Sequence, residues 1–133
     1  MKKLGQKFEQ FVEIVRKLRQ ECPWDREQTL ESLRPFLLEE VNEAIEAIEK
    51  KDYENLAEEV GDMLLHVVML SVFAEEDKHF DLAQVIEIVS AKMKRRHPHV
   101  FSDLKAANSS EVLECWQEIK QQEKKGRRKV WWF

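Results

Sequence analysis

The sequence predicts an all-α protein with one domain, a bundle of about five helices. Glycine and proline occur only three times each in 133 residues, whereas an all-β fold needs many more turn residues. Apolar residues recur in steps of three and four, which is the spacing of amphipathic helices. With 43% hydrophobic and 36% charged residues, the chain suits a helix-rich fold with one core. We place the domain at residues 1–125 and a basic, aromatic tail at 126–133.

The first predicted helix covers residues 4–18, where apolar side chains keep the helical spacing. It should end before Cys22, because that residue precedes Pro23 and a residue before proline avoids the helical region. Asp25 is the expected N-cap of the next helix. Gln28, three residues later, then stands in the position of a capping box.

The second predicted helix carries apolar residues across 33–48, with Pro35 near its start or at a short break, and ends at the polar residues 50–52. The third covers about 53–73 and is apolar nearly all round in its middle. A helix without a clear polar face is usually the buried centre of a bundle, so we expect the third helix to be central.

A fourth helix is expected over 82–97, with Asp81 as its cap and Pro98 as its stop. The segment 99–109 has the composition of a loop. Ser109 or Ser110 is the expected cap of a last helix that continues through Lys120. The chain then becomes basic over 124–129, where we expect a mobile tail, and ends in Trp131-Trp132-Phe133.

Charge and hydropathy exclude some classes of protein. The net charge of −4 does not favour a protein that coats nucleic acid, and no apolar stretch approaches the length that spans a bilayer. The N-terminus lacks the apolar run of a signal peptide. Cys22 and Cys115 lie far apart without zinc-type partners nearby, so a reduced, cytoplasmic setting is expected.

Two pairs of acidic residues interrupt the apolar stripes of the second and third helices. Glu40 and Glu43 form one pair, and Glu59 and Asp62 form the other. Residues three apart on a helix differ by about 60° in direction and about 4.5 Å in height, so each pair can converge on one ion. For any single pair, ordinary solvent-facing carboxylates are the simpler interpretation. Two pairs on neighbouring helices favour a hard divalent cation, magnesium or manganese rather than zinc.

A basic group follows on the fourth helix. Lys92 and Arg96 share a face at i and i+4, with Arg95 beside them. Positive charge at a helix C-terminus is common and complements the helix dipole. The functional alternative is a phosphate site, since arginine binds phosphate oxygens in bidentate fashion and lysine acts as a point charge.

Spacing alone leaves the aromatic and histidine residues ambiguous. Trp116 and Lys120 lie one turn apart; Trp116 is either core, which spacing favours, or a stacking partner for a base. His66, flanked by apolar residues, is typical of a satisfied core histidine. One Glu76–His79 pair falls short of the two ExxH motifs of a di-iron bundle, which makes that class a distant third.

The chain resembles a MazG nucleotide pyrophosphohydrolase domain. The resemblance runs from Cys22-Pro23-Trp24-Asp25 through the string 95–101, RRHPHVF, and on to Trp116-Gln117-Glu118-Ile119-Lys120. The family motif EExxE, a spacer and ExxD stands here at 39–43 and 59–62. The resemblance implies an all-α pyrophosphohydrolase fold whose core is usually completed by dimerisation, and we expect a homodimer or a higher homo-oligomer. It also implies that Glu40, Glu43, Glu59 and Asp62 are magnesium ligands, that Lys92 and Arg96 bind phosphate, and that Trp116 and Lys120 contact the nucleotide.

The resemblance further implies magnesium-dependent hydrolysis of nucleoside triphosphates to monophosphate and pyrophosphate. Manganese is the expected substitute metal, and Glu39 or Glu40 is the expected proton acceptor. A sibling enzyme with a narrower choice of deoxynucleotide or modified nucleotide is one alternative. Relatives often carry two such domains in tandem, and the CPWD and RRHPHVF strings resemble the first of the pair. A non-catalytic nucleotide-binding or regulatory module is therefore the alternative from another class.

Overall fold

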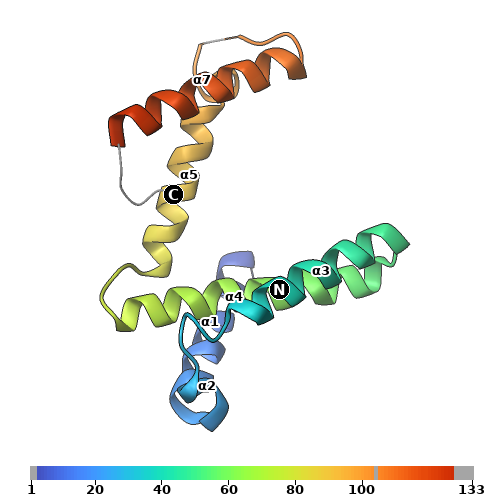
Figure 1. Ribbon diagram of the computed structural model, residues 1–133, viewed down its shortest axis with the longest axis vertical. Helices are drawn as coiled ribbons and strands as arrows, with labels where there is room; N and C mark the ends of the chain where they lie inside the picture. Colours follow the sequence, from blue (N-terminus) through green and yellow to red (C-terminus); the bar gives the residue numbers. More distant parts are fainter. Residues whose placement is uncertain (1–2, 104, 128–133) are drawn as a thin grey trace. The chain divides into compact units, whose positions relative to one another are not determined.

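The structure, a computed structural model, describes residues 3–103 and 105–127. The predicted aromatic terminus, Trp131-Trp132-Phe133, lies outside the described residues. The described residues form seven helices and no strand, which confirms the all-α class. Five of the helices are the long ones that the sequence predicts, and two are short. In chain order they are α1 (Leu4–Glu21), α2 (Pro23–Glu27), α3 (Arg34–Lys50), α4 (Tyr53–Glu76), α5 (Leu82–Arg96), α6 (Pro98–Phe101) and α7 (Ser109–Arg127) (Figure 1).

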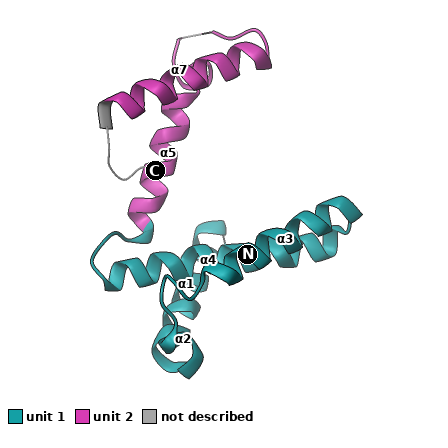
Figure 2. Ribbon diagram, viewed as in Figure 1, with its two compact units in different colours: residues 1–82 teal, residues 83–133 magenta. Residues whose placement is uncertain are grey.

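The chain divides into two compact units, residues 1–82 and residues 83–133 (Figure 2). The first unit contains α1 to α4. The second contains nearly all of α5, together with α6 and α7. No helix of the described residues combines the length and the apolar character needed to cross a membrane.

Helices α3 and α4 form an antiparallel hairpin, and Figure 1 shows them side by side. Lys51 ends α3 in the left-handed conformation, with φ of 55°, and its N–H donates back to the carbonyls of Ala47 and Ile48. Asp52 then caps α4, because its side chain accepts from the N–H of Asn55 at 3.3 Å. The two-residue connection fixes the register of the hairpin, so the acidic pairs on the two helices face each other.

The core of the first unit lies between α1, the segment before α3, and the second half of α4. Its fully covered side chains are Val15, Leu33, Val68, Met69, Val72 and Phe73. The expectation that α4 is buried along its middle holds only in part, because its buried side chains begin at His66. On one face of α4, Val60 is 53% exposed and Val67 is 45% exposed. An apolar face of this helix therefore remains exposed.

Arg19 joins three parts of the first unit. Its guanidinium lies 3.8 Å from the ring centroid of Phe73 and pairs with Glu76 at the end of α4 at 2.8 Å. The same guanidinium donates to the backbone carbonyls of Asp25 and Gln28. One side chain on α1 therefore satisfies carbonyls of the α2 segment and anchors α4.

The prediction that Asp25 caps the second long helix is wrong. Asp25 lies inside the short helix α2, whose N-cap is Cys22 and whose first residue is Pro23. Proline suits the first position of a helix, because its φ is already helical and its missing N–H is not needed there. Gln28 is the C-cap of α2, and the long helix begins only at Arg34.

In the second unit, α5 ends at Arg96 before Pro98, as predicted, but Pro98 starts the short helix α6 where a loop was expected. The N-cap of α7 is Asn108 rather than Ser109 or Ser110. Its side-chain oxygen accepts from the N–H of Glu111 at 3.0 Å. Helix α7 continues to Arg127, well past the expected end.

Candidate metal centre

The structure brings together the four carboxylates that the sequence singles out. Glu40 and Glu43 come from α3, and Glu59 and Asp62 come from α4. One oxygen from each of the four lies within 4.8 Å of the other three. Among the described residues, this is the one group of histidine, cysteine, aspartate and glutamate side chains close enough to hold a metal ion. We call these four residues the acidic cluster.

Local packing explains why the acidic cluster converges. Ala44 and Ala47 follow Glu40 and Glu43 along the inner face of α3 and are buried. Small side chains at these positions let α3 and α4 approach closely at the turn end of the hairpin. Glu40 lies one turn before Ala44, and Glu43 lies one turn before Ala47. Both glutamates are therefore directed at α4.

The acidic cluster contains two covered oxygens that lack a hydrogen-bond partner, Oε2 of Glu40 and Oε2 of Glu59. Unpartnered buried polar atoms are uncommon in folded proteins because each one loses its hydration. Burial raises the pKa of Glu40, and the charges of Asp62 and Glu43 raise it further. A hydrogen bond shared with Glu43, then burial and the neighbouring charges, raise the pKa of Glu59 to about 7.

These observations fit a bound divalent cation. Like charges held this close destabilise one another, and a cation removes both the repulsion and the unmet hydrogen-bonding capacity. All the available donors are carboxylate oxygens, which is the donor set that hard cations such as magnesium and manganese prefer.

Two neighbours border the acidic cluster. His66 is buried, and its Nδ1 lies 2.9 Å from the backbone carbonyl of Asp62. A carbonyl only accepts, so Nδ1 carries the hydrogen and His66 is a hydrogen-bonded core residue, as its apolar neighbours predict. Glu39 is exposed on α3 beside Glu40 and lies outside the set of four ligand oxygens.

The basic residues lie in the second unit, where the arginines contact a partner that the sequence analysis missed. Arg96 donates from Nη2 to Oε1 of Glu123 at 2.8 Å and from Nε to the same oxygen at 3.3 Å. Arg95 donates from Nε to the other oxygen, Oε2. Burial raises the pKa of Glu123, but the hydrogen bonds and charges of the two arginines outweigh burial and hold it at about 2. Lys92 is half-buried one turn before Arg96 on α5.

Trp116 packs among the residues that end α5. Its ring centroid lies 5.2 Å from that of His97 and 6.0 Å from the guanidinium carbon of Arg96. The His97 ring is fixed in turn by a 2.7 Å contact between its Nδ1 and the carbonyl of Met93. Lys120 is half-buried one turn beyond Trp116. The structure thus places Arg96 and Trp116, two of the predicted substrate-binding residues, close to each other.

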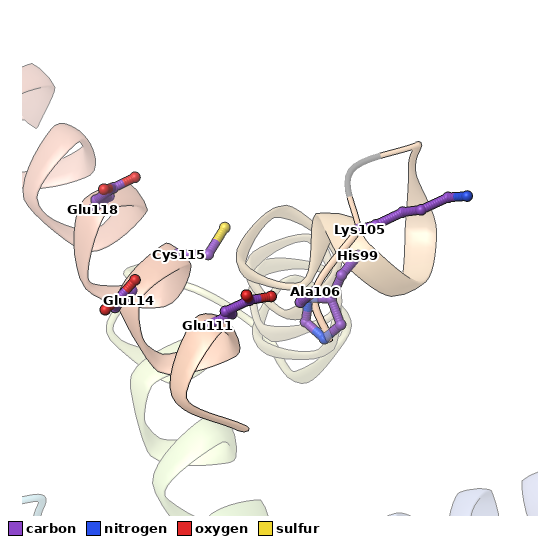
Figure 3. Close-up of a pocket in the computed structure, with 7 residues that line it drawn as sticks. All are labelled: His99, Lys105, Ala106, Glu111, Glu114, Cys115 and Glu118. Atoms are coloured by element: carbon purple, nitrogen blue, oxygen red, sulfur yellow. The ribbon is translucent and has the colours of Figure 1, made fainter. Parts of the chain in front are cut away.

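A cavity of about 180 Å³ lies elsewhere in the second unit, between α7 and the segment before it (Figure 3). Its walls include His99, Lys105, Glu111 and Cys115, and the amino group of Lys105 points away from the other labelled side chains in Figure 3. None of the predicted substrate-binding residues lines this cavity. Its histidine, cysteine and carboxylate atoms are also too far apart to form a metal site.

Glu123 and His97 are the site neighbours that sequence reasoning missed. His97 adjoins the predicted basic group, so proximity in sequence was an available signal. Glu123 lies 27 residues beyond Arg96, and the sequence contains many other glutamates. No periodic pattern distinguishes Glu123 from the other glutamates, so its pairing with the arginines is found only in the three-dimensional structure.

Comparison with known families gives one clear match. The sequence profile described as the MazG nucleotide pyrophosphohydrolase domain matches residues 28–101, which is more than half of the chain. The matched region includes the whole acidic cluster and the basic residues of α5, and it ends before α7.

Individual proteins give the same result. The chain is 42% identical over 120 residues to a nucleoside triphosphate pyrophosphohydrolase of Escherichia coli K12, covering 88% of this chain and 46% of that protein. It is 45% identical over 131 residues to the nucleoside triphosphate pyrophosphohydrolase/pyrophosphatase MazG of Thermotoga maritima, covering 97% of this chain and 49% of that protein. The chain thus spans about half the length of these relatives.

A solved structure shares the fold. The crystal structure of a mazG-related protein from Thermotoga maritima superimposes with a TM-score of 0.73 at 33% sequence identity. The match covers 85% of this chain and 98% of that one.

Proposed function

The chain belongs to the MazG nucleotide pyrophosphohydrolase family, and from that premise we propose that it hydrolyses nucleoside triphosphates to monophosphate and pyrophosphate with magnesium. The observation that carries the proposal is the acidic cluster, four carboxylates within 4.8 Å that include two covered, unpartnered oxygens. Relatives over much of the chain are named nucleoside triphosphate pyrophosphohydrolases, which supports the same reaction class.

In this proposal Glu40, Glu43, Glu59 and Asp62 hold the metal. A divalent cation bound there supplies Lewis acidity that polarises phosphate oxygens and lowers the pKa of bound water. The hairpin holds the four carboxylates in place before the metal arrives, so little reorganisation opposes binding. Manganese is the expected substitute because it accepts the same oxygen donors.

Proton transfer is assigned to Glu39. Its neighbour Glu40 is half-buried inside the acidic cluster, whereas Glu39 is exposed at the preceding position of α3. An exposed carboxylate next to the metal ligands is free to accept the proton of the attacking water. The water oxygen bonds to the α-phosphorus, the bond from that phosphorus to the bridging oxygen breaks, and pyrophosphate leaves with the electron pair.

Phosphate binding is assigned to Lys92, Arg95 and Arg96, and contact with the nucleoside to Trp116 and Lys120. Arginine suits this role because its planar donors match phosphate oxygens in bidentate geometry. Trp116 lies against Arg96 and His97, which fixes its ring and lowers the entropy lost when a base stacks on it.

The exposed apolar face of the α3–α4 hairpin supports a homodimer. Val41, Ile45 and Ile48 on α3 repeat at helical spacing, as do Val60, Leu64 and Val67 on α4, and each is more than a third exposed. Exposed apolar residues that repeat along two neighbouring helices are typical of a protein–protein contact. We assign a second copy of the chain to it, and sedimentation equilibrium should report twice the chain mass of 15.9 kDa. A monomeric mass would contradict the assignment.

The proposed setting is the cytoplasm, where nucleoside triphosphates are made and consumed. Cys22 and Cys115 are both free thiols in the structure, which agrees with a reducing compartment.

The direct test is release of pyrophosphate from each common ribo- and deoxyribonucleoside triphosphate, in magnesium and in EDTA. Magnesium-dependent release with monophosphate as co-product is the expected result, and the panel shows which base and sugar are preferred. Release of inorganic phosphate with diphosphate as co-product would contradict attack at the α-phosphorus. Tight nucleotide binding without turnover of any substrate would instead favour a nucleotide-binding module.

A further inference from the structure

Glu123 accepts hydrogen bonds from Arg95 and Arg96, the side chains that are expected to bind substrate phosphate. Both of its carboxylate oxygens are taken, Oε1 by Arg96 and Oε2 by Arg95. The side chain of Glu123 is only 9% exposed and that of Arg96 only 12%. The pair is therefore largely withdrawn from water and is not an ordinary surface ion pair.

The geometry of Arg96 limits what else it can bind at the same time. Its Nε and one Nη form the edge with which arginine usually grips an oxyanion, and both atoms donate to Glu123. The guanidinium also lies near the Trp116 ring, which restricts its rotation. A phosphate group that seeks the same bidentate contact must first displace the carboxylate.

We propose that Glu123 is a built-in competitor for substrate phosphate, a carboxylate that holds Arg95 and Arg96 until a more highly charged polyphosphate replaces it. The inference rests on the proposed function only in that it takes these arginines as phosphate ligands. A carboxylate carries one negative charge, whereas the chain of a triphosphate carries several. The exchange therefore favours a polyphosphate over singly charged anions and lowers the affinity for all of them.

Displacement has a consequence for α7. Glu123 connects the C-terminal half of α7 to the end of α5, so its release removes that connection. A charged carboxylate that loses two arginine partners in a covered position is destabilised. Glu123 should therefore move into water when phosphate binds, and the backbone around it should loosen.

The test is the affinity for inorganic tripolyphosphate in EDTA, measured by calorimetry for the full chain and for Glu123→Gln. Glutamine keeps the shape of the side chain and removes its charge, so E123Q should bind at least about tenfold more tightly, the factor expected for one charge-assisted hydrogen bond. The matched control is Glu118→Gln, which removes the same charge from an exposed position on the same helix and should change the affinity less than about twofold.

Several results would overturn the inference. Equal or weaker binding by E123Q would mean that Glu123 positions the arginines or merely ties α7 to α5. An equal gain in E118Q would reduce the effect to net charge, and a gain that survives in the R95Q/R96Q/E123Q variant would place the anion elsewhere. No binding by either protein would show that the arginines are not a phosphate site.

A second measurement covers the case in which E123Q fails to fold. Hydrogen exchange of the unmodified chain should become faster around residues 119–125 when tripolyphosphate is added, and unchanged or slower exchange there would contradict displacement. The nucleotide assay separates this inference from the proposed function. If the protein releases pyrophosphate but E123Q does not bind tripolyphosphate more tightly, only the inference about Glu123 is contradicted. If E123Q binds more tightly but the protein turns over no nucleotide, only the proposed function is contradicted.

Discussion

The two compact units differ in the interactions that stabilise each of them internally. In the first unit, side chains such as Leu33 and Val68 are fully withdrawn from water. In the second, no residue among those described in 83–125 reaches that degree of burial. Its helices are joined instead by Arg95 and Arg96 on Glu123 and by the rings of His97 and Trp116. The difference suits their proposed roles, since metal ligands need a rigid scaffold and phosphate ligands benefit from contacts that can exchange.

The largest effect is expected from Glu40→Gln in the first unit. Loss of one ligand charge should lower magnesium-dependent pyrophosphate release by at least about a hundredfold. In EDTA the variant should melt at the same temperature or higher, because a repulsive charge has been removed from the acidic cluster. Glu46→Gln, an exposed position on the same helix, is the control and should keep its activity. Near-normal turnover in E40Q would rule out the metal assignment.

A matched pair of valine substitutions tests the comparison directly. Val68 is fully buried, so Val68→Ala should lower the free energy of unfolding by about 2–3 kcal/mol. Val112 is half-buried on α7, so Val112→Ala should lower the free energy of unfolding by less than about 1 kcal/mol. Urea unfolding measures both. Equal losses would mean that the second unit has a dry core in solution, for instance one completed by another copy of the chain.

In the first unit, the contact between Arg19 and Glu76 adds to the stability of a buried apolar core. Arg19→Met should cost about 1–2 kcal/mol, since the carbonyls of Asp25 and Gln28 lose their donor. The control is Arg16→Met, whose pair with Glu75 is about two-fifths exposed on each side and should cost less than about 1 kcal/mol. A larger loss in the Arg16 variant, measured by the same urea titration, would contradict this ranking.

The smallest expected effects concern how stability depends on pH. The slopes of stability against pH that the two units contribute should have opposite signs. The pKa of Glu59 is about 7 in the folded protein against an ordinary 4.5, so the folded state binds more protons between these values. Metal-free stability should therefore fall as pH rises from about 4.5 to 7. Melting temperatures in EDTA measure this slope, which Glu59→Gln should flatten. A slope that persists unchanged in E59Q would assign it to another group.

Glu123 should contribute a slope in the other direction. Its pKa of about 2 lies below the ordinary 4.5, so its stabilising contact is complete above about 4.5 and is lost as pH falls towards 2. Tryptophan fluorescence during acid titration should report the change, since Trp116 lies against Arg96. Replacing Glu123 with glutamine should remove this transition, and a transition that stays in place would contradict the assignment.

Local patterns predicted much of this molecule, and contacts distant in sequence did not follow from them. The convergence of the acidic cluster was predictable because Glu40 and Glu59 interrupt apolar stripes whose helical period fixes their direction. Asp25 has the side chain of a helix cap but lies within a helix, because Pro23, two residues earlier, already starts one. The pairing of Glu123 with Arg96 depends on how α5 and α7 pack, and many glutamates in the chain fit the same local description.

The short turn between α3 and α4 places the whole acidic cluster within residues 40–62 of one helical hairpin. Its geometry is therefore inherited as a unit. A gene segment encoding this hairpin carries the complete set of metal ligands wherever it is duplicated or recombined. The same arrangement makes the site intolerant of indels, because one residue added within α3 between Ala44 and Lys50 rotates Glu40 and Glu43 by about 100° relative to their partners on α4. Selection should therefore permit variation in length outside the hairpin far more readily than within it.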